Sequence, residues 1–316
     1  MFGAAMSLAG LASSVAYAAD ALEVATVGNA NPVAWLQLIA ARKGMFTAEG
    51  LKVDIIYVPS SAQLTQQVAA GSVNLGFAVG LVDPIRAVGK GAPIALVRLE
   101  GQAAPFALVG KPSIKRIADL KGKTIIIGGE KDITHFYLDR MLVPNGLKQG
   151  DYDLIFSGST PARYAALKSG AVDAAMLFPP FNLFALDDGF SNLGLVVDYA
   201  PNLPFSGTVA NRTWANSHQA LVKRYLSVIT KAVAWFNTDA NRNEAVAILV
   251  DAMHGKPENL AKTYDFFRKI GFFEPTGKLS RTKIEEIADM LKSTGDIPKD
   301  FDLNSLAISS LVPISN

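Results

Sequence analysis

The chain has 316 residues, of which 50% are apolar and 18% charged, so it is long enough for about two domains and too apolar to be disordered. Thirty basic against 28 acidic residues leave a net charge of +2, which argues against nucleic acid as the main partner. The sequence contains no cysteine, which excludes thiol catalysis, cysteine-ligated zinc, iron–sulfur clusters, disulfides and a lipid anchor on cysteine.

Residues 1–19 predict a signal peptide. They are uncharged up to Ala19, mostly small or apolar, and end in Ala16-Tyr17-Ala18, which fits the small-x-small pattern before a cleavage site. The basic segment that normally opens a signal peptide is missing, so we expect the recorded start to lie downstream of the true one. The alternative is an apolar terminus that frays. We expect export through this peptide. No other run of 18 apolar residues occurs, so no further segment is predicted to span a membrane and the mature protein should be soluble.

The segment after this terminus predicts a βαβαβ unit. Alternation and apolar runs predict strands at residues 22–27, 53–58 and 75–79. Between them, Asn31 followed by Pro32 is typical of a helix start, and Ser60 with Ser61 predicts a cap for the next helix.

The same order recurs about 100 residues later. Gly28, Gly50 and Gly71 have counterparts at Gly128, Gly146 and Gly170, and strands are predicted at residues 124–127 and 154–156, with 170–176 paralleling 71–77. Thr160-Pro161 again predicts a helix start. We therefore expect two copies of one unit, each a parallel sheet flanked by helices with right-handed crossovers.

The remainder of the chain predicts a strand at residues 206–211 and helices at about 219–237, 243–254, 258–270 and 282–293. These helices are amphipathic, and we expect their aromatic residues to fill the core.

Six strand-to-helix junctions predict a ligand site, because open α/β sheets bind ligands outside the carboxyl ends of their strands. Helix N-termini there offer unpaired N–H groups that suit an anion or a polar acceptor. The candidate ligand-binding residues are Asn29, Asn31, Trp35, Ser60, Ser61, Gly80, Leu81, Gly129, Glu130, Asp132, Thr134, His135, Ser159, Arg163, Phe178 and Phe181.

These candidates have different expected roles. Trp35 and Phe178 are the first choices for an aromatic wall, and Arg163 is placed to reach an anion. Glu130 and Asp132 are candidates to accept hydrogen bonds from a ligand amine. Each has a structural alternative: the hydroxyls cap helices, the aromatic rings are buried, Arg163 is a solvated surface residue, and the acids favour the helix dipole.

Motifs of catalysis are absent or weak. The chain contains no G-x-S-x-G, H-E-x-x-H or G-x-x-x-x-G-K-[ST], and its three histidines, His135, His218 and His254, are far apart in sequence. We therefore expect no enzyme activity, no cofactor and no metal site.

Four segments resemble a known family. Residues 41–53 (ARKGMFTAEGLKV), 70–76, with Asn74 where aspartate is usual, 117–125 (IADLKGKTI) and 169–174 (SGAVDA) are similar to signatures of periplasmic ABC-transporter solute-binding proteins. The group is the NMT1/THI5-like one, which contains binders of nitrate, taurine, aliphatic sulfonates and thiamine pyrimidines. The resemblance covers most of residues 22–198.

The resemblance implies a bilobal type II periplasmic binding protein fold. Lobe one would comprise residues 20–108 and 205–316, and lobe two residues 109–204, with hinges near 106–109 and 205–208. A ligand that touches both lobes would favour the closed form, which a membrane permease and its ATPase would then recognise. We expect a monomer in the periplasm.

The ligand stays open at this point. Cap N–H groups and hydroxyls suit nitrate or sulfonates, whereas aromatic stacking with a carboxylate suits a pyrimidine precursor, so a small organic anion with an aromatic or apolar part fits both features. One rival is an enzyme on the same scaffold, of the futalosine-pathway type. The yeast-type pyrimidine synthase depends on a cysteine-rich motif that is absent here. A regulator's effector lobe would need a helix-turn-helix before the first strand.

Overall fold

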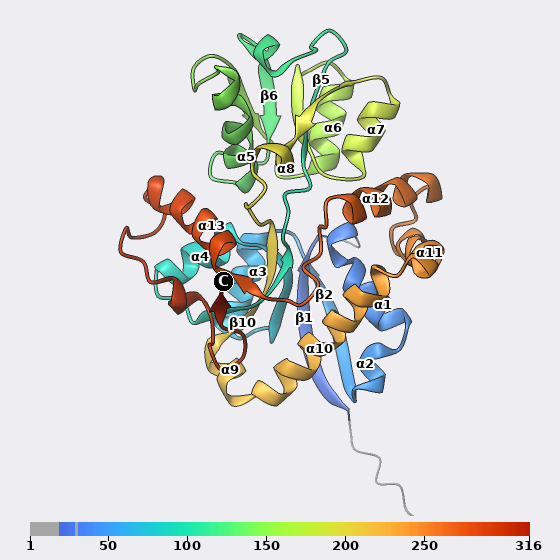
Figure 1. Cartoon of the computed structure of the whole chain (residues 1–316), viewed down its shortest axis with the longest axis vertical. Coiled ribbons are helices and arrows are strands. Elements are labelled where there is room, and N and C mark those ends of the chain that lie inside the picture. Colours follow the sequence, from blue (N-terminus) through green and yellow to red (C-terminus); the bar gives the residue numbers. More distant parts are fainter. Residues whose placement is uncertain (1–18, 29–30) are drawn as a thin grey trace, which may run out of the picture.

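The computed structural model describes residues 19–28 and 31–316, so the predicted signal peptide lies outside the described residues except for Ala19. The described chain forms two α/β lobes, drawn one above the other in Figure 1, each around a five-stranded sheet. The expected α/β class with two sheets is therefore confirmed. Among the described residues, no helix has the length and apolarity needed to cross a membrane.

The sheet of lobe one has the strand order β2-β1-β3-β10-β4. Its strands are β1 (Asp20–Val27), β2 (Leu51–Val58), β3 (Leu75–Gly80), β4 (Ile94–Gly101) and β10 (Ser206–Asn211). β1, β2 and β3 run parallel, and β10 runs antiparallel to both of its neighbours.

The sheet of lobe two has the order β7-β6-β8-β5-β9. Its strands are β5 (Ala107–Gly110), β6 (Thr124–Ile127), β7 (Asp153–Phe156), β8 (Ala174–Leu177) and β9 (Ser191–Leu195). β6, β7 and β8 run parallel, and β5 runs antiparallel to β8 and β9.

The two sheets share one topology, which confirms the repeat. In each, three parallel strands come first and a fourth, antiparallel strand follows. That fourth strand is the one formed directly after the chain arrives from the other lobe. Gly71 and its counterpart Gly170 both have positive φ, 73° and 80°, at the ends of the equivalent helices α3 and α6. An L side chain at either position would be strained, which explains why glycine recurs there.

Helices cover both faces of each sheet (Figure 1). The helices of lobe one are α1 (Trp35–Arg42), α2 (Met45–Ala48), α3 (Ser61–Ala70), α4 (Val82–Gly89), α9 (Arg212–Ser217), α10 (Gln219–Phe236), α11 (Arg242–Met253), α12 (Pro257–Lys269) and α13 (Arg281–Ser293). Those of lobe two are α5 (Ile133–Leu142), α6 (Thr160–Lys168), α7 (Phe181–Asp187) and α8 (Val196–Tyr199). Short 3-10 turns are η1 (Pro32–Ala34), η2 (Ile117–Leu120), η3 (Val143–Asn145), η4 (Asp239–Asn241) and η5 (Leu303–Leu306), and β11 (Leu279–Ser280) pairs with β12 (Ile314–Ser315). The four long C-terminal helices match their predicted ranges to within one residue at either end.

The chain crosses between the sheets twice, through residues 102–106 and 200–205 (Figure 1). Ala107 and Leu108, which we expected in lobe one, pair with Leu177 and Met176 of lobe two. The crossings therefore lie at, or just before, the segments predicted as hinges.

Candidate functional site

The carboxyl ends of the parallel strands face the space between the lobes. Figure 1 shows β6 running toward lobe one, with its partners β7 and β8 parallel to it. The charge of Asp132, which precedes α5 in lobe two, acts on the carboxyl of Asp83, in the first turn of α4 in lobe one. Lys131, beside Asp132, also lies 3.9 Å from Asp296, which bonds Arg86 of α4, so the segments that follow β3 and β6 lie near each other across the lobes. That they share a ligand site stays a prediction.

In lobe one, the candidates Asn31, Ser60 and Ser61 sit at helix starts. Asn31 Oδ1 accepts a hydrogen bond from the Val33 N–H at 2.8 Å, and Ser60 Oγ accepts one from the Gln63 N–H at 3.2 Å. Both side chains thus act as the predicted caps. Asn29 lies outside the described residues.

The junctions after β2 and β3 converge. A Cβ placed on Gly80 would lie 3.3 Å from Ser61 Oγ, so the serine hydroxyl stands directly beside the Gly80 backbone. Leu81 is buried in the core, and its N–H bonds to the Phe205 carbonyl at 3.2 Å. Leu81 was a candidate ligand contact; instead its side chain packs in the core and its backbone N–H joins the start of α4 to a crossing segment.

In lobe two, Asp132 caps α5 and holds Thr134. Asp132 Oδ1 accepts from the Thr134 N–H at 2.9 Å and also from the Thr134 hydroxyl. Thr134 Oγ1 in turn accepts from the Gly128 N–H at 2.7 Å. The Thr134 hydroxyl was a candidate ligand contact, but it is buried and fully engaged in this turn, so its role here is structural.

The remaining candidates of this turn lie nearer the surface. His135 Nδ1 lies 2.6 Å from the Glu130 carbonyl oxygen, an approach that requires the ring nitrogen to carry the proton. Gly129 is half-buried, and Glu130 is exposed. Ser159, at the start of α6, is also exposed, and its side chain makes no capping bond.

Arg163 is buried, which corrects the expectation of a surface arginine or a direct anion contact. Its guanidinium donates to the Met176 carbonyl at 2.8 Å, the Ser157 carbonyl at 2.7 Å and Thr160 Oγ1 at 2.7 Å. It forms no ion pair with any carboxylate in the described part of the chain. Burial lowers the pKa of Arg163 to about 10, which the charge of Asp132 opposes, so it stays cationic at neutral pH.

Trp35 does not line the space between the lobes. Its ring is fully buried, its indole N–H donates to the Ala245 carbonyl at 2.8 Å, and the rings of Phe236 and Tyr264 pack edge-on at 5.2 and 5.8 Å. The expectation that Trp35 walls a ligand cavity is therefore wrong for this conformation, because the C-terminal helices cover it.

Phe178, the other first choice, lies where the lobes meet. Its ring is 5.3 Å from Phe106 and 5.6 Å from Phe205, one on each crossing segment, and 6.1 Å from Phe267 of α12 in lobe one. It is only partly buried. Phe181 instead packs within lobe two, 5.9 Å from Tyr164.

Sequence reasoning missed Tyr137 and Asn182. Both are buried in lobe two, and neither Tyr137 Oη nor Asn182 Oδ1 has a hydrogen-bond partner among the described residues. Tyr137 packs 5.6 Å from Phe106, and burial holds the pKa of its hydroxyl well above the usual range. The only signal for these two residues in the sequence was their position close to the predicted strand-to-helix junctions.

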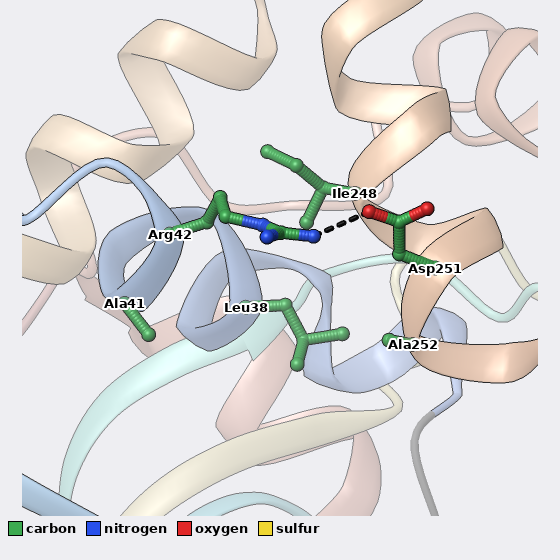
Figure 2. A pocket seen from close by; sticks show the side chains of 6 residues that line it. All are labelled: Leu38, Ala41, Arg42, Ile248, Asp251 and Ala252. Carbon is green, nitrogen blue, oxygen red and sulfur yellow. Dashed lines mark hydrogen bonds and ion pairs between the residues drawn. The ribbon is translucent and has the colours of Figure 1, made fainter.

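An open surface depression of about 390 Å³ lies elsewhere, between α1 and α11 (Figure 2). Leu38, Ala41, Ile248 and Ala252 line it, and Figure 2 shows the Arg42 side chain reaching across it to Asp251. No candidate ligand residue lines this depression. Within residues 19–28 and 31–316, no cluster of three or more histidine or acidic side chains could hold a metal ion.

Asp83 gives a pH-dependent prediction. Burial, with the nearby charge of Asp132, raises the pKa of the Asp83 carboxyl although Arg86 opposes this. Its protonated form thus favours the folded state, a contribution that is complete at acidic pH and lost as pH rises through the raised pKa. We expect Asp83→Asn, without ligand, to raise Tm at pH 7 by about 1–3 °C and to raise it much less at pH 4. A lower Tm at pH 7 would show that the Arg86 pairing outweighs burial.

The comparisons with known proteins agree with the family resemblance of the sequence motifs. A family profile described as NMT1/THI5 like matches residues 31–241, about two thirds of the chain. The chain belongs to this family. Within the NMT1/THI5-like family, it is 26% identical over 141 residues to the 4-amino-5-hydroxymethyl-2-methylpyrimidine phosphate synthase THI13 of Saccharomyces cerevisiae. The match covers 44% of this chain and 40% of the length of that relative.

Solved structures show the fold. The periplasmic aliphatic sulphonate binding protein SsuA of Escherichia coli is similar with a TM-score of 0.77 and 23% identity, over 92% of each chain. SsuA of Xanthomonas axonopodis pv. citri, an alkanesulfonate-binding protein solved with MOPS, has a TM-score of 0.73 and 20% identity, over 93% of this chain and 98% of that one. The desulfurization enzyme DSZB also matches, with a TM-score of 0.69 and 16% identity, over 91% and 96%. These likenesses confirm the predicted bilobal periplasmic binding protein fold.

Proposed function

We propose that this NMT1/THI5-like protein is an exported solute-binding protein that takes up a small organic anion between its lobes and presents it to an ABC permease and its ATPase. The observation that carries the proposal is the pair of sheets whose strand ends face each other and are joined by two crossing segments. Most of the solved structures named above are binding proteins with this arrangement.

Two features of the site support an anion. The N-terminus of α3 presents Ser60 and Ser61 beside Gly80, and a helix N-terminus carries a partial positive charge. Arg163, a buried cation without an ion-pair partner in the described chain, lies under the start of α6 through its bond to Thr160. An anion between the lobes would gain from both.

A pyrimidine precursor is the second candidate. It is favoured by the match to the yeast synthase and by the approach of Asp83 and Asp132 from the two lobes, because two carboxylates suit a ligand amine. An enzyme on the same scaffold, as DSZB shows for this fold, is the further alternative.

A thermal-shift panel separates these candidates. We expect methanesulfonate or benzenesulfonate to raise Tm, since a ligand at 100 times its Kd adds about 2.7 kcal/mol of stability, or roughly 5–10 °C here. A shift by nitrate alone would replace the organic anion by an inorganic one. The variant Ser61→Asp places a negative charge in the first turn of α3, which suits the helix dipole but repels an anion. It should therefore keep the apo Tm and lose the shift.

The same panel includes 4-amino-5-hydroxymethyl-2-methylpyrimidine. A shift by this compound alone, unaffected by Ser61→Asp, would replace the anion by the pyrimidine. Chemical conversion of any bound compound, read by mass spectrometry, would favour the enzyme.

A further inference from the structure

Ion pairs join the lobes on both sides of the crossing segments. Lys262 of α12 in lobe one bonds both carboxylate oxygens of Asp187, the last residue of α7 in lobe two, at 2.8 and 2.6 Å. Arg140 of α5 in lobe two bonds Glu286 of α13 in lobe one at 2.7 Å. In Figure 1 the α12–α7 contact lies to the right of the crossing segments and the α13–α5 contact to their left.

A weaker third contact accompanies the second pair. Lys131, just before α5, lies 3.9 Å from Asp296, which follows α13 and is already bonded to Arg86 at 2.9 Å. Each contact joins one helix or loop per lobe, and within the described residues the two crossing segments are the only covalent links between the lobes. A rotation of one lobe on the other in the plane of Figure 1 therefore lengthens at least one of these pairs.

We propose that Asp187–Lys262 and Arg140–Glu286 act as latches, positioning residues that hold the lobes in the described arrangement and so set ligand affinity without touching the ligand. Only the predicted effect on ligand affinity rests on the proposed function. The side chains of both pairs are about one third to one half exposed, so each pair shifts the ratio of the described arrangement to a more widely opened one by about two- to fivefold. Salt weakens both latches by screening.

The chain offers a matched control one residue away. Asp188 follows Asp187 but bonds Lys168 at 2.7 Å and the hydroxyl of Tyr164, both inside lobe two. Asp187→Asn and Asp188→Asn make the same chemical change at adjacent positions, and only the first breaks a contact between lobes.

The test measures lobe separation directly. Because the chain has no cysteine, Lys90→Cys in lobe one and Lys148→Cys in lobe two, both at exposed positions, take two spin labels at defined sites. Pulsed dipolar spectroscopy on the ligand-free protein then gives the distribution of distances. We expect Asp187→Asn with Arg140→Gln to move population to a second distance, and 1 M NaCl to do the same to the unsubstituted pair. Asp188→Asn should leave the distribution unchanged.

Two outcomes overturn the latches: a double variant whose distribution equals that of the parent, or an Asp188→Asn control that shifts as much as Asp187→Asn. In the Arg140→Gln background, the swapped pair Asp187→Lys with Lys262→Asp should return the distribution to that of Arg140→Gln alone, which shows that the charges rather than misfolding cause the change. The readout needs no ligand, so a failed ligand screen would reject the proposed function and leave this result standing. With any ligand found, the double variant should weaken affinity by at most about 25-fold, and by less the larger the latched population of the parent is.

Discussion

Replacing Arg98 by methionine is expected to lower the free energy of unfolding by about 3–5 kcal/mol, because it leaves a buried carboxylate without its cation. Arg98 and Glu100, on β4, are both almost fully buried and lie 3.1 Å apart. Arg98 also donates to Thr230 Oγ1 at 2.8 Å and to the Glu274 carbonyl at 3.0 Å, so it ties α10 and the C-terminal segment to the sheet.

The pH dependence identifies the cause. Burial raises the pKa of Glu100, although Arg98 and a hydrogen bond from Thr208 oppose this. A raised carboxyl pKa means that stability is greatest when Glu100 is protonated and falls as pH rises through that pKa. Without Arg98 the penalty grows, so Arg98→Met should lose less stability at pH 4 than at pH 7 in denaturant titrations. Adding Glu100→Leu should recover most of the loss. A single variant within 1 kcal/mol of the parent at pH 7 would contradict this account.

Trp35→Ala is expected to cost about 3–5 kcal/mol, since it empties the space of a fully buried aromatic side chain. It also leaves the Ala245 carbonyl without the indole N–H that donates a hydrogen bond to it. Chemical denaturation measures the loss. Trp35→Phe keeps an aromatic ring against Phe236 and Tyr264 and should be much milder.

The ligand response of Trp35→Phe decides between core and site. If Trp35 only packs the core, the folded variant binds within about twofold of the parent. A Trp35→Phe variant with the Tm of the parent and a tenfold weaker ligand affinity would show that Trp35 belongs to the ligand site.

Most of the fold could be predicted from the internal repeat of the sequence. The glycines at 71 and 170 and the three parallel strands of each copy were readable because each needs a specific local conformation. β4 was not predicted, because Arg98 and Glu100 interrupt its apolar run, and only their pairing with each other and with Thr208 makes burial possible. β5 and β9 are four and five residues long, and their pairing depends on strands far along the chain.

The sequence predicted where the candidate site lies in the fold better than it predicted the roles of single residues. Asn31, Ser60 and Asp132 cap their helices because capping is local. Trp35, Arg163 and Thr134 were misjudged because burial depends on what packs over them: α11 and α12 on Trp35, the ends of β7 and β8 on Arg163. Phe178 was placed well because it follows β8 directly, where the crossing segments pass.

Calorimetric titration of the purified protein with methanesulfonate and benzenesulfonate, in the parent and in Ser61→Asp, shows whether an organic anion binds at the start of α3. We expect saturable one-to-one binding of at least one of these sulfonates to the parent, recovery of the compound unchanged, and loss of binding in Ser61→Asp with the fold intact. Binding of a sulfonate that Ser61→Asp does not weaken, or turnover of the bound compound, would contradict the proposed function.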